Sequence, residues 1–235
     1  MKAHFNKSGN IKLGKNMWSF SKLCGTKNYY IRKYDMTVSG TCGGFCAGCE
    51  AECYVNKSYR YGSVLQCHAE NTVAMMTDCN QAFRDLQKQI DNARNKPEII
   101  RIHQSGEIQT ALEFYNWVYM AQRNPGIKFY IYTKAFSIVI PIIQETYNSG
   151  LWPVNFCVNI SVWHECGLKE FESVKHIPQM KAFAYIDGFK YPFTANTYCF
   201  AYDENGKLNH DITCEKCGKC FRTGEKSKVI GCNAH

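Results

Sequence analysis

The fold of this chain is decided by residues 128–147, which read KFYIYTKAFSIVIPIIQETY. The part from Lys128 to Thr133 is rich in aromatic and β-branched side chains, a pattern that predicts a strand. Apolar residues then recur at helical spacing from Phe136 to Tyr147, which predicts a helix that is bent or begun at Pro141. A strand followed directly by a helix is the repeating unit of an α/β fold.

The same unit recurs on both sides of this stretch. Further strands are predicted to begin near residues 99, 155 and 181, with helices between them. The strand starts are roughly 26 to 29 residues apart, the spacing of βα units whose parallel strands are joined by right-handed crossovers. With one or two more strands before Cys42, the expected fold class is α/β, in the form of a partial (β/α) barrel.

In barrels of this kind the chemistry lies at the carboxyl ends of the strands. Ser105, Gly106 and Glu107 follow the strand near residue 99, and such a turn can aim a carboxylate into the barrel mouth to hold an ammonium group. Lys134 follows the strand 128–133 and could meet a carboxylate or a phosphate. We therefore take Ser105, Gly106 and Glu107 as candidate cofactor-binding residues, and Glu107 and Lys134 as candidate catalytic residues.

Each of these residues also has a purely structural interpretation. Glu107 could stand in the first turn of the following helix, where a negative charge complements the helix dipole. Lys134 could be a solvated lysine at a strand end. Weaker candidates of the same kind are Trp163, His164 and Asp187.

The pattern of the chain changes after residue 190. Residues 191–235 have few apolar side chains and many cysteines, lysines and glycines, so they cannot form a core of their own. A bound metal would supply the missing stabilisation. We expect residues 1–190 to form the barrel-like domain with an N-terminal cysteine loop, and residues 191–235 to form a cysteine-rich, metal-binding appendage packed on it.

Composition indicates the compartment. No run of about 18 apolar residues exists, and the first residues lack the apolar region of a signal peptide. We therefore expect a cytoplasmic chain with no membrane partner. In a reducing compartment, 14 cysteines favour metal binding over disulfides. The net charge of +8 permits a nucleic-acid partner, although a solvated basic surface explains it equally well.

The first cysteine group lies in the loop 41–54 and consists of Cys42, Cys46, Cys49 and Cys53. Neighbouring glycines let the backbone wrap tightly around a metal centre. The spacing Cys42-x3-Cys46-x2-Cys49 resembles that of radical S-adenosylmethionine enzymes, in which three thiolates hold a [4Fe–4S] cluster. That resemblance implies a fold like the core of those enzymes, and S-adenosylmethionine as a candidate cofactor on the open iron.

The number of thiolates decides between two outcomes at this loop. If Cys53 adds a fourth thiolate, the cluster is closed and serves electron transfer or structure rather than catalysis. Since the loop is short and no other strong donor is evident nearby, we expect Cys46 to take part and the cluster to be closed. A structural zinc site is the alternative.

The second cysteine group lies in the tail. Cys214-x2-Cys217-x2-Cys220 resembles part of a ferredoxin cysteine run, which predicts a second iron–sulfur cluster. Zinc competes here, because it accepts four thiolates, or three and an imidazole, from short loops. The fourth ligand is Cys199 or Cys232, with His210 and His235 as weaker candidates. The remaining cysteines have no motif spacing and are expected to be buried small hydrophobes: Cys24, Cys67, Cys79, Cys157 and Cys166.

A set of motifs in a fixed order gives the chain a family resemblance. The chain resembles the bacteriophage "gene product eighty-eight" domain proteins over nearly its whole length. The resemblance is carried by Gly9-Asn10-x-Lys12-Leu13-Gly14, Thr41-Cys42-x6-Cys49-x3-Cys53-Tyr54, Arg101-x-His103-x-Ser105-Gly106-Glu107, Phe129-Tyr130-x-Tyr132-Thr133-Lys134, and the cysteine tail that ends in His235.

The resemblance implies a viral iron–sulfur protein with a radical-enzyme-like barrel that acts in the cytoplasm of a bacterial host. In the family pattern the matching loop cysteines are Cys42, Cys49 and Cys53, so that Cys46 is an extra one. The tail pattern makes Cys199 the favoured fourth ligand. Two departures, Phe200 where the family has proline and Glu107 where it has aspartate, remove no ligand.

The sequence thus predicts a phage-encoded iron–sulfur protein, with one or two [4Fe–4S] clusters, in a redox or radical-enzyme-like role on an unnamed substrate. Its partner would be a small molecule or a redox protein, and whether it is an enzyme is left open. The alternative is a nucleic-acid-binding module that zinc or a cluster stabilises, without catalysis. Nothing in the sequence indicates an oligomeric state.

Overall fold

The computed structural model describes residues 1–7, 12–43, 49, 53, 55–163, 166–185, 197–200, 209, 211–224 and 228–232. Five residues named above as candidates lie outside those ranges: Cys46, His164, Asp187, His210 and His235.

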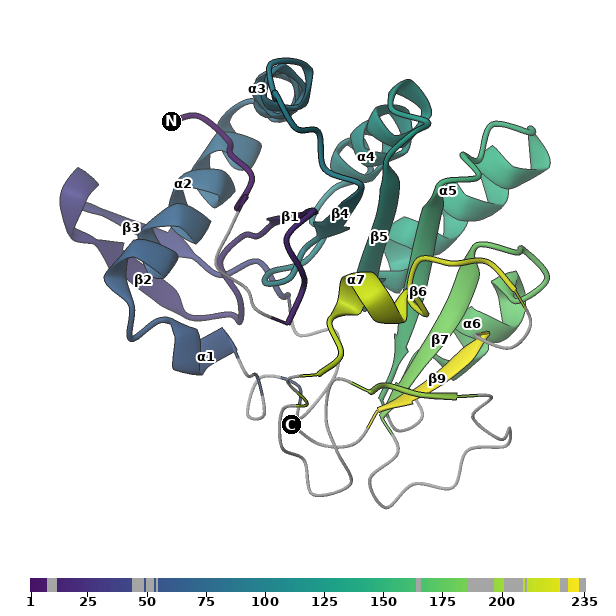
Figure 1. The fold of residues 1–235 in the computed structure, drawn as a ribbon. Coiled ribbons are helices and arrows are strands. Elements are labelled where there is room, and N and C mark those ends of the chain that lie inside the picture. Colours follow the sequence, from purple (N-terminus) through teal and green to yellow (C-terminus); the bar gives the residue numbers. More distant parts are fainter. Residues whose placement is uncertain are drawn as a thin grey trace.

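A parallel sheet forms the centre of the molecule (Figure 1). Its seven strands follow the spatial order β1-β4-β5-β6-β7-β9-β8, and every neighbouring pair is parallel. The strands predicted near residues 99, 128, 155 and 181 are confirmed. The bounds are β1 Met17–Phe20, β4 Ile99–Ile102, β5 Lys128–Thr133, β6 Phe156–Val162, β7 Met180–Tyr185, β8 Thr197–Tyr198 and β9 Val229–Cys232.

The sheet is open in the described part of the chain. Its edge strands are β1 and β8, and no pairing among the described residues joins them. The α/β class and the parallel sheet are therefore confirmed, whereas closure into a barrel is not shown.

The longer helices lie between the strands as predicted, whereas the two four-residue helices Val55–Ser58 and Cys214–Cys217 were not predicted. Two helices meet at Asp78, whose carboxylate caps the second of them by accepting a hydrogen bond from the Gln81 amide at 2.8 Å. Pro141 lies within a continuous helix that begins at Phe136. The bounds are α1 Val55–Ser58, α2 Gly62–Thr77, α3 Cys79–Asp91, α4 Ala111–Arg123, α5 Phe136–Asn148, α6 Leu168–Val174 and α7 Cys214–Cys217.

Two smaller features complete the described part. A hairpin of β2 Asn28–Ile31 and β3 Met36–Ser39 packs against α2. In the described residues, no helix combines the length and the apolar character that crossing a bilayer requires.

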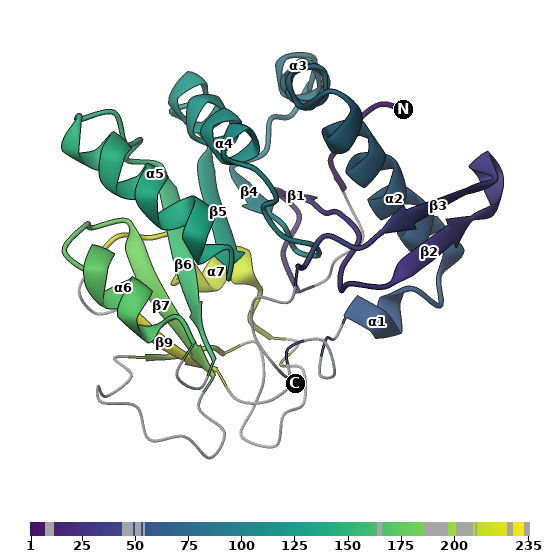
Figure 2. The same cartoon turned by 180° about the vertical axis from the view of Figure 1, so that it is seen from behind.

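The two faces of the sheet differ in chemistry. Side chains alternate between faces along a strand. On β5, Phe129 and Ile131 join the large apolar core, whereas Tyr130 and Tyr132 lie on the other face. Figures 1 and 2 show α4, α5 and α6 covering the first face and α7 lying across the second. The second face is the more polar one and carries, on successive strands, Arg101, Tyr132, Asn159 and Lys181.

One buried charge pair ties the end of β1 to α4. The Lys22 Nζ lies 2.8 Å from a Glu113 carboxylate oxygen, and both side chains are almost fully buried. The other Glu113 oxygen lies 3.0 Å from the His103 Nε2. Burial lowers the pKa of His103, so its imidazole is neutral near pH 7. Burial opposes the ionisation of Glu113, yet Lys22 and His103 outweigh it and lower the pKa of that carboxyl to about 2.

The tail is connected to the rest of the chain at two places. β9 lies between β7 and β8 within the sheet. The amides of Cys214 and Glu215 donate to the carbonyls of Lys12 and Leu13 at 2.8 and 3.0 Å. The family motif near the N-terminus thus supports the cysteine helix α7. The division of the chain at residue 190 stays a prediction, because residues 186–196 lie outside the described part.

Candidate metal-binding cavity

The described cysteines of both groups line one cavity of about 470 Å³. Its walls come from the carboxyl ends of β4, β5, β6 and β7, from the loop after β3, and from α7. Every predicted metal ligand that the structure describes lies on this wall, together with Ser105, Gly106, Glu107 and Lys134. The cysteines on the wall are Cys24, Cys42, Cys49, Cys53, Cys199, Cys214, Cys217, Cys220 and Cys232.

The Ser-Gly-Glu turn is held against the loop that leads to Cys42. The Glu107 amide donates to the Thr41 hydroxyl at 3.0 Å. Gly106 has φ +80°, and a β-carbon there would lie 2.7 Å from the Thr41 Oγ1 and 2.8 Å from the Lys22 Cβ. Only glycine fits this position without displacing its neighbours.

The Glu107 carboxylate is anchored at the end of β5. It accepts hydrogen bonds from the Thr133 hydroxyl at 2.8 Å, the Lys134 amide at 2.7 Å and the Ile108 amide at 2.9 Å. The following helix begins at Ala111, so the interpretation of Glu107 as a first-turn residue of that helix is wrong. The first-turn acid is Glu113. Glu107 instead fixes the turn while lying on the cavity wall.

Replacing Gly106 by alanine is expected to lower the free energy of unfolding by about 2–4 kcal/mol, because a left-handed backbone and a steric overlap both oppose the β-carbon. Gly150 is the matched control, since it has φ +70° but a β-carbon added there would meet no atom within 4 Å. Gly150→Ala should cost only about 1–2 kcal/mol. Urea unfolding of the three proteins measures both differences. Equal losses would show that the close approach at Gly106 contributes nothing.

The loop end of the cavity holds three described cysteines of the first group. Cys42, Cys49 and Cys53 are half-buried free thiols. Burial raises the pKa of Cys42 to about 12, and the neighbouring Glu107 carboxylate adds to that rise. In the absence of a metal these surroundings keep the Cys42 thiol protonated, so a cation that binds there must displace its proton.

The tail end of the cavity is organised by α7. Thr213 caps this helix by accepting from the Lys216 amide at 3.3 Å, and Gly218 ends it in a left-handed conformation. The Tyr132 hydroxyl donates to the Cys220 sulfur at 2.8 Å. The Asn159 amide group donates to the Cys220 carbonyl at 3.1 Å. Strands β5 and β6 therefore fix the orientation of Cys220.

The two candidates for the fourth tail ligand are neighbours. The Cys199 amide donates to the Gly231 carbonyl at 2.8 Å, and the Cys199 and Cys232 side chains are hydrogen-bonded to each other. Both thiols line the cavity. The choice between Cys199 and Cys232 stays open, because each lies on the same wall as Cys214, Cys217 and Cys220.

The donor set fits an iron–sulfur cluster in its chemistry, since cysteine thiolates are the ligands of such clusters. Among the described residues, no three histidine, cysteine or acidic side chains converge closely enough to hold a single metal ion. A four-iron core bridges thiolates that lie farther apart than the ligands of one ion.

The cavity wall is basic and aromatic. Among its described lining residues, Glu107 is the one acid, against the four bases Lys12, Arg101, Lys134 and Lys219. The Arg101 guanidinium lies 5.0 Å from the Tyr132 ring centroid. This balance of charge favours anionic contents.

Lys134 and Trp163 lie together at the rim. The Lys134 Nζ is 5.7 Å from the centroid of the Trp163 ring, and that ring stacks on Tyr185 at 4.0 Å. Cation–π contacts of this kind hold a lysine side chain over an aromatic face. The structure therefore brings two predicted site residues, Lys134 and Trp163, into contact with each other.

The sequence motifs did not identify several residues of the cavity wall, among them Cys24, Arg101 and Tyr132. Cys24 was expected to be only a buried apolar residue; it is buried, but its side chain also lines the cavity. Its position after the first strand was the signal that could have found it. Of the other isolated cysteines, Cys157 is buried as expected, Cys67 and Cys79 are half-buried, and Cys166 is half-buried and disulfide-bonded.

These features define an α/β protein with an open parallel sheet and a thiol-lined cavity at the carboxyl ends of its strands. Residues 4–223 match the family model Gene product 88. The chain therefore belongs to the Gene product 88 family, which confirms the family suggested by the sequence motifs. No curated protein and no solved structure matches the chain significantly.

Proposed function

We propose that this chain is a phage-encoded iron–sulfur protein that holds one [4Fe–4S] cluster at the loop cysteines and a second at the tail cysteines, and that it serves a redox role in the host cytoplasm. The observation that carries the proposal is the common cavity, whose wall holds nine cysteines from both ends of the chain. When bound, such clusters supply one-electron transfer.

The surroundings of the cavity support anionic clusters. A [4Fe–4S] core with four thiolates carries a net negative charge, and Arg101, Lys12 and Lys219 on the wall offset it. The Tyr132 hydroxyl supplies a hydrogen bond to a ligand sulfur, which is one of the ways proteins set cluster potentials. The basic side chains would offset the charge of the thiolates, and the Tyr132 hydroxyl would orient a ligand sulfur, whichever redox reaction the cluster serves.

A radical-enzyme-like role is the second candidate, and one observation favours it. Glu107 lies on the wall beside Cys42, so its carboxylate could receive the ammonium group of S-adenosylmethionine if one iron at the loop is open. Ser105 and Gly106 would then position that carboxylate, since the Ser105 hydroxyl donates to the Lys22 carbonyl at 2.9 Å. Lys134 would face an acidic group of the substrate.

The test is the metal content of the full chain purified without oxygen. We expect a brown protein with absorbance near roughly 400 nm, with iron and sulfide in equal amounts and about four irons per cluster. A colourless protein that carries stoichiometric zinc would contradict the proposal. Binding to DNA or RNA that weakens steeply with salt would favour the alternative of a nucleic-acid module. Reductive cleavage of added S-adenosylmethionine would favour the radical-enzyme role.

A further inference from the structure

Cys24 lies directly beside the cysteine loop. It follows β1, and two backbone hydrogen bonds hold its segment against the start of the loop. The Thr41 amide donates to the Leu23 carbonyl, and the Cys42 amide donates to the Gly25 carbonyl, both at 3.0 Å. A β-carbon at Gly40 would collide with the Cys24 carbonyl oxygen, so the close approach of the two segments depends on that glycine.

The backbone of Cys24 is fully engaged by two tyrosines. Its amide donates to the Tyr59 hydroxyl at 2.9 Å, and its carbonyl accepts from the Tyr29 hydroxyl at 3.0 Å. Tyr29 and Tyr59 in turn meet edge to face, with ring centroids 5.2 Å apart. These contacts fix the main chain at Cys24, and the Cys24 sulfur also lies 3.9 Å from the Tyr29 hydroxyl oxygen.

The Cys24 thiol lies beside a predicted ligand. The Cys24 thiol donates to the Asn56 Oδ1 at 3.7 Å, and the Asn56 amide donates to the Cys53 carbonyl at 3.2 Å, so Cys24 is a free thiol beside Cys53 on the cavity wall. Cys24 is also only 1% exposed, so it is held at that place by the core rather than by a surface loop. A buried cysteine with a purely packing role needs no place on the wall of a cavity lined by other cysteines.

From this geometry we infer that Cys24 is a ligand of the loop metal centre, together with Cys42, Cys49 and Cys53. The inference rests on the proposed function, since it concerns the same cluster. With Cys24, which follows β1, the cluster has four thiolate ligands even without Cys46. Cys46 is then dispensable, and no iron of the cluster is left open. The hydroxyl groups of Tyr29 and Tyr59 then surround a ligand residue and orient it.

Four proteins purified without oxygen test the assignment: the wild type, Cys24→Ser, Cys46→Ser and Cys157→Ser. Cys157 is the matched control, because it is equally buried at 1% exposure but does not line the cavity. We expect Cys24→Ser to lose the iron of the loop cluster, about half of the total, while Cys46→Ser and Cys157→Ser keep all of it. Full iron in Cys24→Ser, or a loss in Cys46→Ser alone, would overturn the assignment.

The stability of Cys24→Ser with and without metal shows whether Cys24 is a metal ligand or only a packing residue. Unfolding of the wild type and of Cys24→Ser is compared with metal bound and again after chelation. A ligand role predicts a large difference between the two proteins in the loaded state and almost none in the chelated state. Equal destabilisation in both states would assign Cys24 to packing and end the inference. A wild type without iron would instead refute the proposed function itself.

Discussion

Replacing Lys22 by methionine is expected to lower the free energy of unfolding by about 3–5 kcal/mol, because it leaves the buried Glu113 carboxylate without its ammonium partner. The two atoms lie 2.8 Å apart, with 0% and 3% of their side chains exposed. Water cannot replace the lost charge at this depth. Urea unfolding at pH 7 measures the change.

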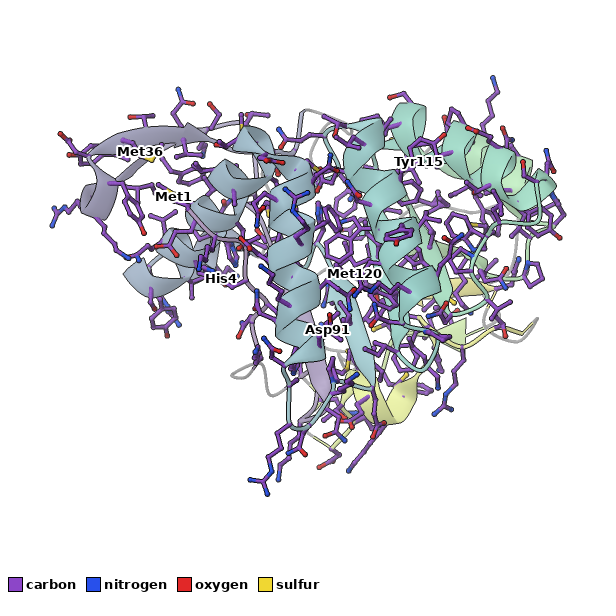
Figure 3. All side chains as sticks on the ribbon, turned by 90° about the horizontal axis from the view of Figure 1, so that it is seen from above. Met1, His4, Met36, Asp91, Tyr115 and Met120 are labelled. Atoms are coloured by element: carbon purple, nitrogen blue, oxygen red, sulfur yellow. The ribbon has the colours of Figure 1, made fainter. Side chains whose placement is uncertain are left out.

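Two controls show whether the loss comes from the unpaired charge. The double variant Lys22→Met with Glu113→Leu removes both charges and should recover most of the stability. Arg123→Ala breaks the exposed pair with Asp91, 3.3 Å apart, and should cost less than about 1 kcal/mol. Figure 3 shows Asp91 at the end of α3, on the outer surface. A double variant as unstable as Lys22→Met would contradict the explanation.

The same pair predicts the acid sensitivity of the fold. The pKa of Glu113 is lowered from 4.5 to about 2 in the folded chain, so protonation is more favourable in the unfolded chain. The contribution of the pair is therefore fully present above pH 4.5, and it is lost as the pH falls from there towards 2. Lys22→Met removes the largest influence that lowers the Glu113 pKa, so stability should depend less on pH over that range.

Replacing Cys220 by serine is expected to remove the tail cluster, about half of the total iron under the proposed function, and to release α7 from the sheet. This helix has only four residues, and under the proposed function its thiolates on the metal would hold it in place together with its amide hydrogen bonds. Without the metal, the hydrogen bonds to Lys12 and Leu13 are too few to keep it ordered. Limited proteolysis should then cut within residues 211–224 before it cuts elsewhere.

Two further variants make this result specific. Cys67→Ser changes a cysteine that does not line the cavity and should keep all the iron and the wild-type cleavage pattern. Tyr132→Phe removes only the hydroxyl that donates to the Cys220 sulfur, so it should keep the iron and shift the reduction potential of one cluster. Full iron and unchanged proteolysis in Cys220→Ser would show that the tail cysteines hold no metal.

The regular part of the fold could be predicted because its signal is local. A strand or a helix shows its period within a few residues, as in residues 99–147. The helix cap at Asp78 is likewise a hydrogen bond between residues close in sequence. The short strand β9 was missed, since four residues in a tail rich in lysine and cysteine show too little periodicity. Its place between β7 and β8 is decided by pairing with strands distant in sequence.

The part of the candidate site that consists of short motifs could also be predicted from the sequence. The cysteine spacings in the loop and the tail, and the Ser-Gly-Glu turn after β4, are short motifs, and they identified most of the cavity wall. Cys24 and Tyr132 could not be found in this way. Cys24 has no motif spacing, and the motif that contains Tyr132 does not indicate its contact with Cys220; each lies beside a cysteine from another part of the chain.

The sequence by itself determined the α/β class, the strand–helix units, the family and the two cysteine groups, because each of these depends on a pattern of residues close together in the sequence. Only the tertiary structure decided that both groups face one cavity, that Lys22 meets Glu113, and that Cys24 lies against Cys53. These contacts depend on how parallel strands align their carboxyl ends at one edge. That alignment follows from burying a common core, which no single stretch of sequence encodes.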